Sequence, residues 1–251
     1  MSYKNRALTR RSLLGAGAAL ATSAALSAEQ SKPEKNGATL SPASGLGVSI
    51  LVDALKAVGQ DAVALTMSRD IRSLTSQSRT VMGPAVTTKW QTGSGRMTAE
   101  DVSRNMFVPL DQASDGSIWI VAGGGGNLVS LFGGIIGAAC KRNGLSAAIT
   151  DNGCRDVETF NDVDFPVFAQ GAVPYGPGDT ARPVDANVPV MCGGVRVSPG
   201  DTVAADADGI VVIPSAVLAE VLDAAKEVLR KEKAVMDRID DGMKLSEAYD
   251  L

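Results

Sequence analysis

The stretch GGIIGAACKRNGLSAAITDNGCRD, residues 133–156, places a helix, a strand and a polar segment in direct succession. Its first half predicts a helix, with Lys141 and Arg142 near the C-terminal end and Gly144 as the stop. The small apolar residues 146–150 predict a strand. A helix that leads directly into a strand is typical of an α/β fold.

After this strand come Arg155 and Asp156, two opposite charges side by side. Adjacent residues of an extended segment point to opposite faces, so the pair does not fit a single solvent-facing surface. We interpret it as a candidate functional site, with a guanidinium and a carboxylate at the mouth of a strand. A structural ion pair between the two residues is the alternative.

Two glycines open the predicted helix, and they allow two interpretations. The free N–H groups of the first turn point outward with the positive end of the helix dipole, and such a terminus binds a carboxylate or phosphate. Close packing of the helix against a sheet, through the glycines, is the other interpretation. The residues concerned are Gly133, Gly134, Ile135 and Ile136.

Outside this stretch the hydrophobic patterns alternate between helix and strand. Residues 47–59 predict a short amphipathic helix ended by Gly59, and a long helix from Ser215 carries one apolar stripe under a charged face. No internal repeat is visible. The patterns predict one α/β domain with a C-terminal helix. Further strands are predicted at residues 80–90, 117–123, 165–171, 188–197 and 209–214.

The composition excludes several classes of function. The chain has 251 residues and a formal net charge of -4, so no basic face for nucleic acid is expected. It contains no histidine, which removes Ser-His-Asp and Cys-His catalysis and the usual zinc ligand sets. Any chemistry must use carboxylates, Arg, Lys, backbone amides, or a hard metal ion on oxygen ligands.

The cysteines support neither a disulfide framework nor a zinc site. There are three, Cys140, Cys154 and Cys192, an odd number without a CxxC motif. Cys154 lies inside the polar segment, but the chain has no histidine to activate it. We therefore interpret Cys154 as a small residue in the wall of the site rather than a nucleophile.

The first 28 residues have the features of an export signal. A basic start that includes Arg10 and Arg11 precedes an Ala- and Gly-rich stretch, which is too short for a good membrane span. The arginine pair fits a twin-arginine signal, which predicts a periplasmic protein without a stable membrane anchor. An uncleaved leader on a cytoplasmic protein is the alternative. Residues 29–44 predict a solvated linker, and residues 45–251 the folded domain.

The order of these segments resembles a known family. The segments that carry the resemblance are VDALKAVG, VMGPAVTTK, residues 133–156, FPVFAQG, VSPGDTVAADADGIVVIP and the tail GMKLSEAY. They are similar to the regulator of ribonuclease activity A (RraA) family. Its catalytic members are class II aldolases acting on 4-hydroxy-4-methyl-2-oxoglutarate and 4-carboxy-4-hydroxy-2-oxoadipate. The resemblance covers about residues 45–251.

The aldolase pattern in this family is a glycine, twenty residues, Arg-Asp, two residues and an acid. Twenty residues lie between Gly134 and Arg155-Asp156, as the pattern requires. The acidic position falls on Thr159, although Glu158 is one place early. Asn152 also departs from the pattern, because it stands where the family usually has glycine.

The resemblance implies a three-layer swivelling β/β/α fold, assembled as a homotrimer or a dimer of trimers. It implies that Asp156 anchors Mg²⁺ or Mn²⁺, that the amides of residues 133–136 hold the carboxylate of a small 2-oxo acid, and that Arg155 stabilises the keto oxygen. The implied activity is cleavage of 4-hydroxy-2-oxo acids to pyruvate, with oxaloacetate decarboxylation as a side activity.

A non-catalytic binding protein, like the ribonuclease inhibitor of the same family, is the alternative function. Thr159 favours this alternative, whereas the matched spacing of Gly134, Arg155 and Asp156 favours the lyase. The predicted export signal weakens the case for a ribonuclease as partner, because an exported protein could not reach a cytoplasmic one.

Overall fold

The computed structural model describes residues 45–249, apart from 77–78, 94 and 124–127. The predicted leader, residues 1–28, and the predicted linker, residues 29–44, lie outside the described residues. The described residues belong to the segment that the sequence assigns to the folded domain.

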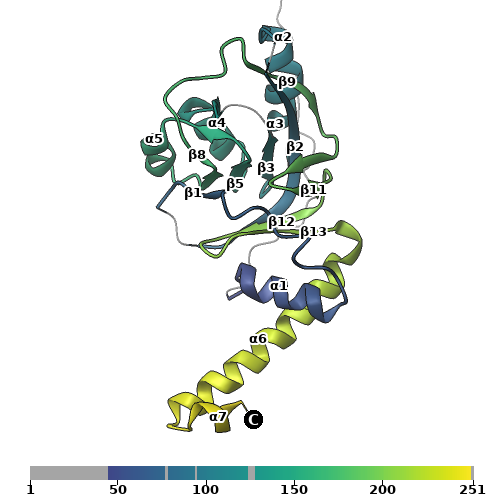
Figure 1. Ribbon diagram of the computed structural model, residues 1–251, viewed down its shortest axis with the longest axis vertical. Helices are drawn as coiled ribbons and strands as arrows, with labels where there is room; N and C mark the ends of the chain where they lie inside the picture. The colour runs from purple at the N-terminus through teal and green to yellow at the C-terminus, as the bar shows by residue number, and fades with distance from the viewer. Residues whose placement is uncertain (1–44, 77–78, 94, 124–127, 250–251) are drawn as a thin grey trace, which may run out of the picture. The chain divides into compact units, whose positions relative to one another are not determined.

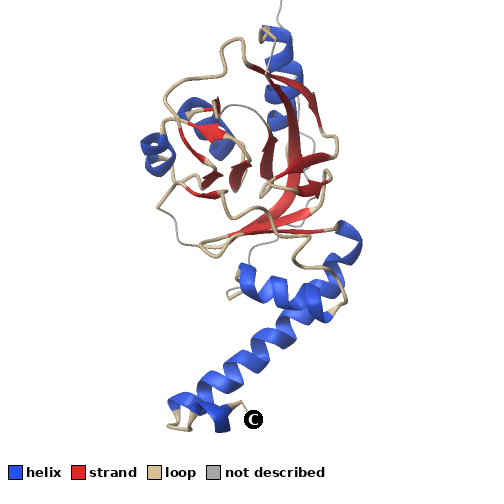
Figure 2. Cartoon of the chain, viewed as in Figure 1, coloured by secondary structure: helices blue, strands red, loops and turns tan. Residues whose placement is uncertain are grey.

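The long strand β2 (Val81–Thr92) organises the main sheet. Its residues 81–84 pair antiparallel with β12 (Thr202–Ala205), and residues 85–89 pair parallel with β3 (Ile118–Ala122). Its last residues pair with β9 (Ala181–Ala186). The eight-stranded sheet has the order β1-β7-β5-β3-β2-β12-β13, with β9 beside β2, and Figure 2 shows how it curls. Its other strands are β1 (Arg72–Ser73), β5 (Ala147–Thr150), β7 (Val167–Ala169) and β13 (Ile210–Ile213).

A repeated unit builds three layers on this sheet (Figure 1). After β3 come β4 and α4, after β5 come β6 and α5, and after β7 comes β8. The short strands pair in parallel as a second sheet, in the order β4-β6-β8. Each unit therefore adds one strand to each sheet, which confirms the expected three-layer β/β/α fold. The bounds are β4 (Ser130–Phe132), α4 (Gly134–Arg142), β6 (Gly153–Cys154), α5 (Val157–Asp162) and β8 (Gly171–Ala172).

The side chains of β3 alternate between two apolar cores of the domain. Ile118, Ile120 and Ala122 belong to one apolar cluster, and Trp119 and Val121 belong to another. Successive side chains of a strand point to opposite faces, so the two clusters lie on opposite faces of the main sheet. The first includes the hairpin of β10 (Val190–Cys192) and β11 (Val195–Val197), and the second includes residues of β4, α4 and α5.

The predicted helices at both ends of the domain form a third core. Helix α1 (Val48–Ala57) packs against α6 (Leu218–Asp240) and β13. A 3-10 turn, η2 (Ser215–Val217), follows Pro214, so the α-helix begins three residues later than predicted. The short helix α7 (Leu245–Ala248) follows α6. None of the described helices is long and apolar enough to cross a membrane.

Some predicted elements were wrong in detail. Residues 188–197 form a hairpin rather than one strand, because Gly193 and Gly194 have φ of 57° and 84°, as a tight turn requires. Residues 165–171 divide between β7 and β8. The connection from β2 to β3 holds three short helical segments that the sequence patterns did not predict. These are α2 (Ala99–Val102), the π-helical turn η1 (Ser103–Phe107) and α3 (Val108–Asp111).

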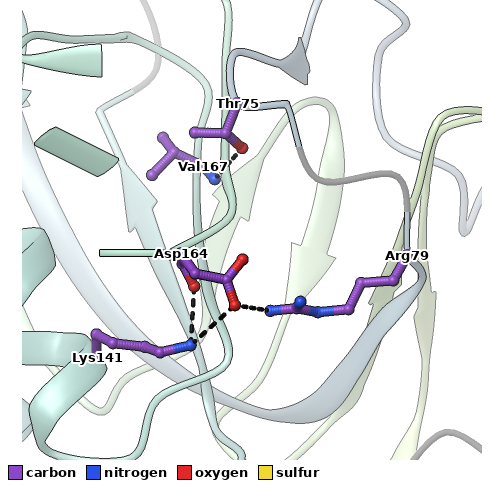
Figure 3. Close-up of polar contacts among 5 residues, drawn as sticks. All are labelled: Thr75, Arg79, Lys141, Asp164 and Val167. Atoms are coloured by element: carbon purple, nitrogen blue, oxygen red, sulfur yellow. Dashed lines mark hydrogen bonds and ion pairs between the residues drawn. The ribbon is translucent and has the colours of Figure 1, made fainter. Parts of the chain in front are cut away.

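Asp164, just after α5, contacts two basic side chains, Lys141 and Arg79, as Figure 3 shows. Lys141, in the last turn of α4, donates to the Asp164 carbonyl at 2.8 Å, and Arg79 forms an ion pair with its carboxylate at 2.9 Å. Beside them, the Val167 N–H donates to the Thr75 hydroxyl at 3.2 Å. Exposed ion pairs stabilise only weakly, so the hydrogen bond from Lys141 is the contact that ties the end of α4 to the turn after α5.

Candidate active site

The residues singled out in the sequence meet at one edge of the small parallel sheet. Strand β4 ends just before Gly133, and β6 ends just before Arg155. Phe132 and Cys154 are paired across the two strands, and the Arg155 N–H donates to the Phe132 carbonyl at 3.2 Å. The carboxyl ends of parallel strands are the usual place for a ligand in α/β proteins. The structure therefore brings the α4 N-terminus and the Arg-Asp pair together.

The conformation of Asp156 corrects one expectation. Because its φ is 62° and its ψ 43°, the chain is left-handed there rather than extended, and the two charges do not point to opposite faces. The Asp156 Oδ2 atom lies 3.8 Å from the Arg155 Nε atom, and both side chains are about half exposed (47% and 49%). Aspartate tolerates this conformation better than most residues. An ion pair this exposed contributes little stability, so both groups remain accessible to a ligand.

The N-terminus of α4 already holds a carboxylate, that of Asp156. The Gly134 N–H donates to Asp156 Oδ2 at 3.0 Å, and the Ile136 N–H donates to the Gly133 carbonyl at 3.1 Å. The N–H groups of Gly133 and Ile135 have no acceptor within the described part of the chain. Four amides, those of residues 133–136, are predicted to hold a substrate carboxylate. Only the N–H groups of Gly133 and Ile135 remain available among these four.

Gly133 leaves the space that the side chains of Arg155 and Asp156 occupy. A Cβ atom there would lie 2.6 Å from Asp156 Oδ2 and 3.0 Å from Arg155 Cγ. Its φ of -144° is ordinary extended backbone, so the requirement for glycine is the close approach of these two side chains. Any side chain at this position would displace them.

Two other glycines of α4 allow close packing against α5. A Cβ atom on Gly134 would lie 2.7 Å from the Cβ atom of Thr159, and one on Gly137 would lie 2.4 Å from the Phe160 ring. Both interpretations of the glycines therefore hold in part. The close packing is against a helix, however, and not against a sheet as the sequence suggested.

Thr159, where the aldolase pattern has an acid, faces α4 directly. Glu158 is exposed and one residue earlier on a regular helix, which turns it about 100° away from Thr159. Glu158 therefore does not substitute for an acid at position 159. Among the described residues no group of three acidic or cysteine side chains could hold a metal ion.

Asp156 alone is the candidate metal ligand. A hard oxygen donor suits Mg²⁺ or Mn²⁺, and Mg²⁺ is commonly bound by one or two carboxylates while it keeps several waters. The Gly134 N–H fixes one oxygen of the carboxylate, and the side chain is about half exposed. The donor therefore fits a largely hydrated ion.

Two further residues of the polar segment, Asn152 and Cys154, have structural roles. Asn152 is buried, and its Oδ1 atom accepts from the N–H groups of Val129 and Gly153, each at 2.8 Å. It thus ties the start of β4 to β6, which accounts for an asparagine at a position where glycine was expected. Burial, with a smaller effect of the Asp156 charge, raises the pKa of Cys154 to about 12. The thiol stays protonated near neutral pH and is not a nucleophile.

Comparison with known proteins identifies the family and agrees with the fold. The RraA-like family model, described as Aldolase/RraA, matches residues 48–212. The chain belongs to this family. A Halalkalibacterium halodurans relative named "Putative 4-hydroxy-4-methyl-2-oxoglutarate aldolase" is 31% identical over 169 residues, 67% of this chain and 76% of that protein. An uncharacterised protein of Methanocaldococcus jannaschii is 30% identical over 183 residues, 72% of this chain and 83% of that protein.

Solved structures share the fold of this RraA-like chain. An uncharacterised Pseudomonas syringae protein has a TM-score of 0.69 at 25% identity, over 81% of this chain and 92% of that one. Streptomyces coelicolor RraAS2, titled an unusual member of the RNase ES inhibitor RraA protein family, has a TM-score of 0.64 at 25% identity. That match covers 75% of this chain and 90% of RraAS2.

Proposed function

We propose that this RraA-like protein is a divalent-metal-dependent lyase that cleaves 4-hydroxy-4-methyl-2-oxoglutarate and similar acids to pyruvate. The observation that carries the proposal is the Arg155 guanidinium 3.8 Å from the Asp156 carboxylate, at the N-terminus of α4. Family membership and the printed name of the Halalkalibacterium halodurans relative support it.

The backbone amides at the start of α4 and the Arg155 side chain have separate roles in binding the 2-oxo acid. The N–H groups of Gly133 and Ile135 donate to its carboxylate at the positive end of α4. Arg155 donates to the keto oxygen and stabilises the negative charge that develops there. The 4-hydroxyl loses its proton to a water molecule and becomes the carbonyl of the second product as the C3–C4 bond breaks. The electron pair of that bond passes into the enolate of pyruvate, which then takes up a proton from water. Oxaloacetate decarboxylation passes through the same enolate and is the expected side activity.

Asp156 would hold the divalent cation. When bound, Mg²⁺ or Mn²⁺ would act as a Lewis acid that polarises the keto group of the substrate, and its positive charge would also attract the substrate carboxylate. The chain's own contribution is orientation: the Gly134 N–H holds Asp156 Oδ2, and the left-handed backbone keeps the carboxylate beside Arg155.

Pyruvate release tests this assignment, with and without added Mg²⁺. Asp156→Asn keeps a side chain that tolerates the left-handed backbone and can still accept from Gly134, but it removes the charge. Turnover should fall at least about 100-fold, as expected for loss of a group that stabilises the transition state. Asp162→Asn is the matched control, because Asp162 is exposed in α5 outside the site, and it should keep full turnover. An Asp156→Asn protein with more than about a tenth of the wild-type rate would remove Asp156 from the mechanism.

A second function is a non-catalytic binding protein, and Thr159 is the observation that favours it. This threonine lies against Gly134 where the aldolase pattern has an acid, and the fold is shared with RraAS2. The same assay decides, because a folded wild-type protein without metal-dependent pyruvate release would support binding rather than catalysis.

The assembly and the location of the protein are part of the proposal. We expect a homotrimer or a dimer of trimers, as the family resemblance implies, and export by the twin-arginine signal in residues 1–28. Sedimentation analysis of the full chain tests the first expectation. Fractionation of cells that express the Arg10→Lys, Arg11→Lys double variant tests the second.

A further inference from the structure

A cavity of about 400 Å³ lies away from the Arg-Asp pair, where the main sheet meets the β10–β11 hairpin. Lys89 and Ala122 are paired across β2 and β3, and Asp151 directly follows β5. These three residues line the cavity at the carboxyl ends of neighbouring parallel strands. Arg196 of β11 lines it from the hairpin. The cavity shares no lining residue with the Arg-Asp site.

Two cations that line the cavity have no partner among the described residues. Neither Lys89 nor Arg196 forms an ion pair or side-chain hydrogen bond within the described part of the chain. Asp151 forms no ion pair with either cation in the described part of the chain; its two oxygens accept from the backbone N–H groups of Gly123 at 2.8 Å and Gly193 at 3.3 Å. The cavity therefore has a local excess of positive charge in a chain whose net charge is -4. Such a focused charge attracts anions.

The remaining wall is largely apolar. Trp90, Val190 and Met191 contribute to it, and Met191 is 57% exposed. The volume is within the usual range for small-molecule sites, about 300 to 1,000 Å³. Cations beside an apolar wall suit an anion with an organic body better than a bare inorganic ion. Because Asp151 offsets one of the two positive charges, a singly charged ligand balances the cavity.

We propose that this cavity is a second binding site, specific for a small organic monocarboxylate. The carboxylate lies between Lys89 and Arg196, and the apolar body lies against Val190 and Met191. The backbone N–H groups of Gly123 and Gly193 keep the Asp151 carboxylate at one side, where it repels ligands of higher negative charge.

Titration of the full-length protein with cyclohexanecarboxylate tests the proposal. Calorimetry measures the affinity, and tryptophan fluorescence reports the place, because Trp90 lines the cavity and the only other tryptophan of the chain, Trp119, is fully buried. We expect saturable binding in the millimolar range or tighter. Lys89→Gln and Arg196→Gln should each weaken it about tenfold, as for a lost charge-assisted hydrogen bond.

Two protein controls and two ligand controls make the outcome decisive. Arg72→Gln removes an exposed cation from β1, at the far edge of the same sheet, and should bind like wild type. Arg155→Gln should also bind like wild type; weaker binding in this variant would place the ligand at the Arg-Asp pair and overturn the proposal. Cyclohexanecarboxamide and inorganic phosphate should bind at least about tenfold more weakly. Equal binding of either compound, unchanged affinity in both cavity variants, or no saturable binding at all contradicts the assignment.

Discussion

Gly134→Ala tests the contact on which the site geometry depends. The new methyl group would lie 2.7 Å from both Cβ and Cγ2 of Thr159, and 2.9 Å from its hydroxyl oxygen. Carbon atoms in favourable contact are about 3.5 to 4.0 Å apart, so α5 must move away from α4. That movement displaces Asp156, which precedes α5 and accepts the Gly134 N–H.

The size of the effect is set by two opposing terms. Overpacking a close contact costs about 1 to 3 kcal/mol of the free energy of unfolding. Alanine is a better helix former than glycine by about 1 kcal/mol in a helix interior, and by less at the first helical position, where residue 134 stands. We therefore expect Gly134→Ala to destabilise the fold by about 1 to 2 kcal/mol and to lower the rate of pyruvate release.

Urea unfolding measures the loss, with a lower midpoint at an unchanged slope. Repeating the substitution in a Thr159→Gly background removes the three atoms nearest to the new methyl group, so there it should cost much less. The resulting coupling energy should be at least about 1 kcal/mol. Gly171→Ala is the control, because among the described residues its methyl group would meet only Leu128 Cδ2, at an ordinary 3.6 Å. If Gly134→Ala unfolds at the wild-type urea concentration in both backgrounds, α4 and α5 do not pack as described.

Two further predictions concern the acid missing at position 159 and the thiols. Thr159→Glu should raise metal-dependent turnover about tenfold, as expected for a supporting carboxylate beside a metal ligand; Glu158→Gln should change little, because Glu158 faces away from α4. A severe loss in Glu158→Gln would reverse this assignment. Burial raises the pKa of Cys140 to about 12, and Cys140, Cys154 and Cys192 are all buried, so at pH 8 the thiols stay protonated. A thiol reagent should react with the folded protein at least about 100-fold more slowly than with the unfolded chain, and a fast-reacting thiol would contradict this.

Local patterns are sufficient to predict the main elements of the fold. The bulky apolar side chains of residues 117–123 predict a strand, and apolar positions at helical spacing predict α1 and α6. The repeated β/β/α unit is not visible in the sequence, because β6 and β8 have only two residues each. Two residues are too few to show the alternation of apolar and polar side chains that identifies a strand. These strands are defined only by their hydrogen bonds to one another in the folded structure.

Residue types, together with the resemblance to the RraA family, indicate which residues could carry chemistry: the chain lacks histidine, and twenty residues separate Gly134 from Arg155-Asp156. How these residues meet depends on tertiary structure. The left-handed turn at Asp156, the hydrogen bond from Gly134 and the contact of Thr159 with α4 all require the pairing of β4 with β6. The same holds for the cavity between Lys89 and Arg196, which are far apart in the sequence. Charge and residue type are local properties, whereas a site needs distances that only the packed sheets set.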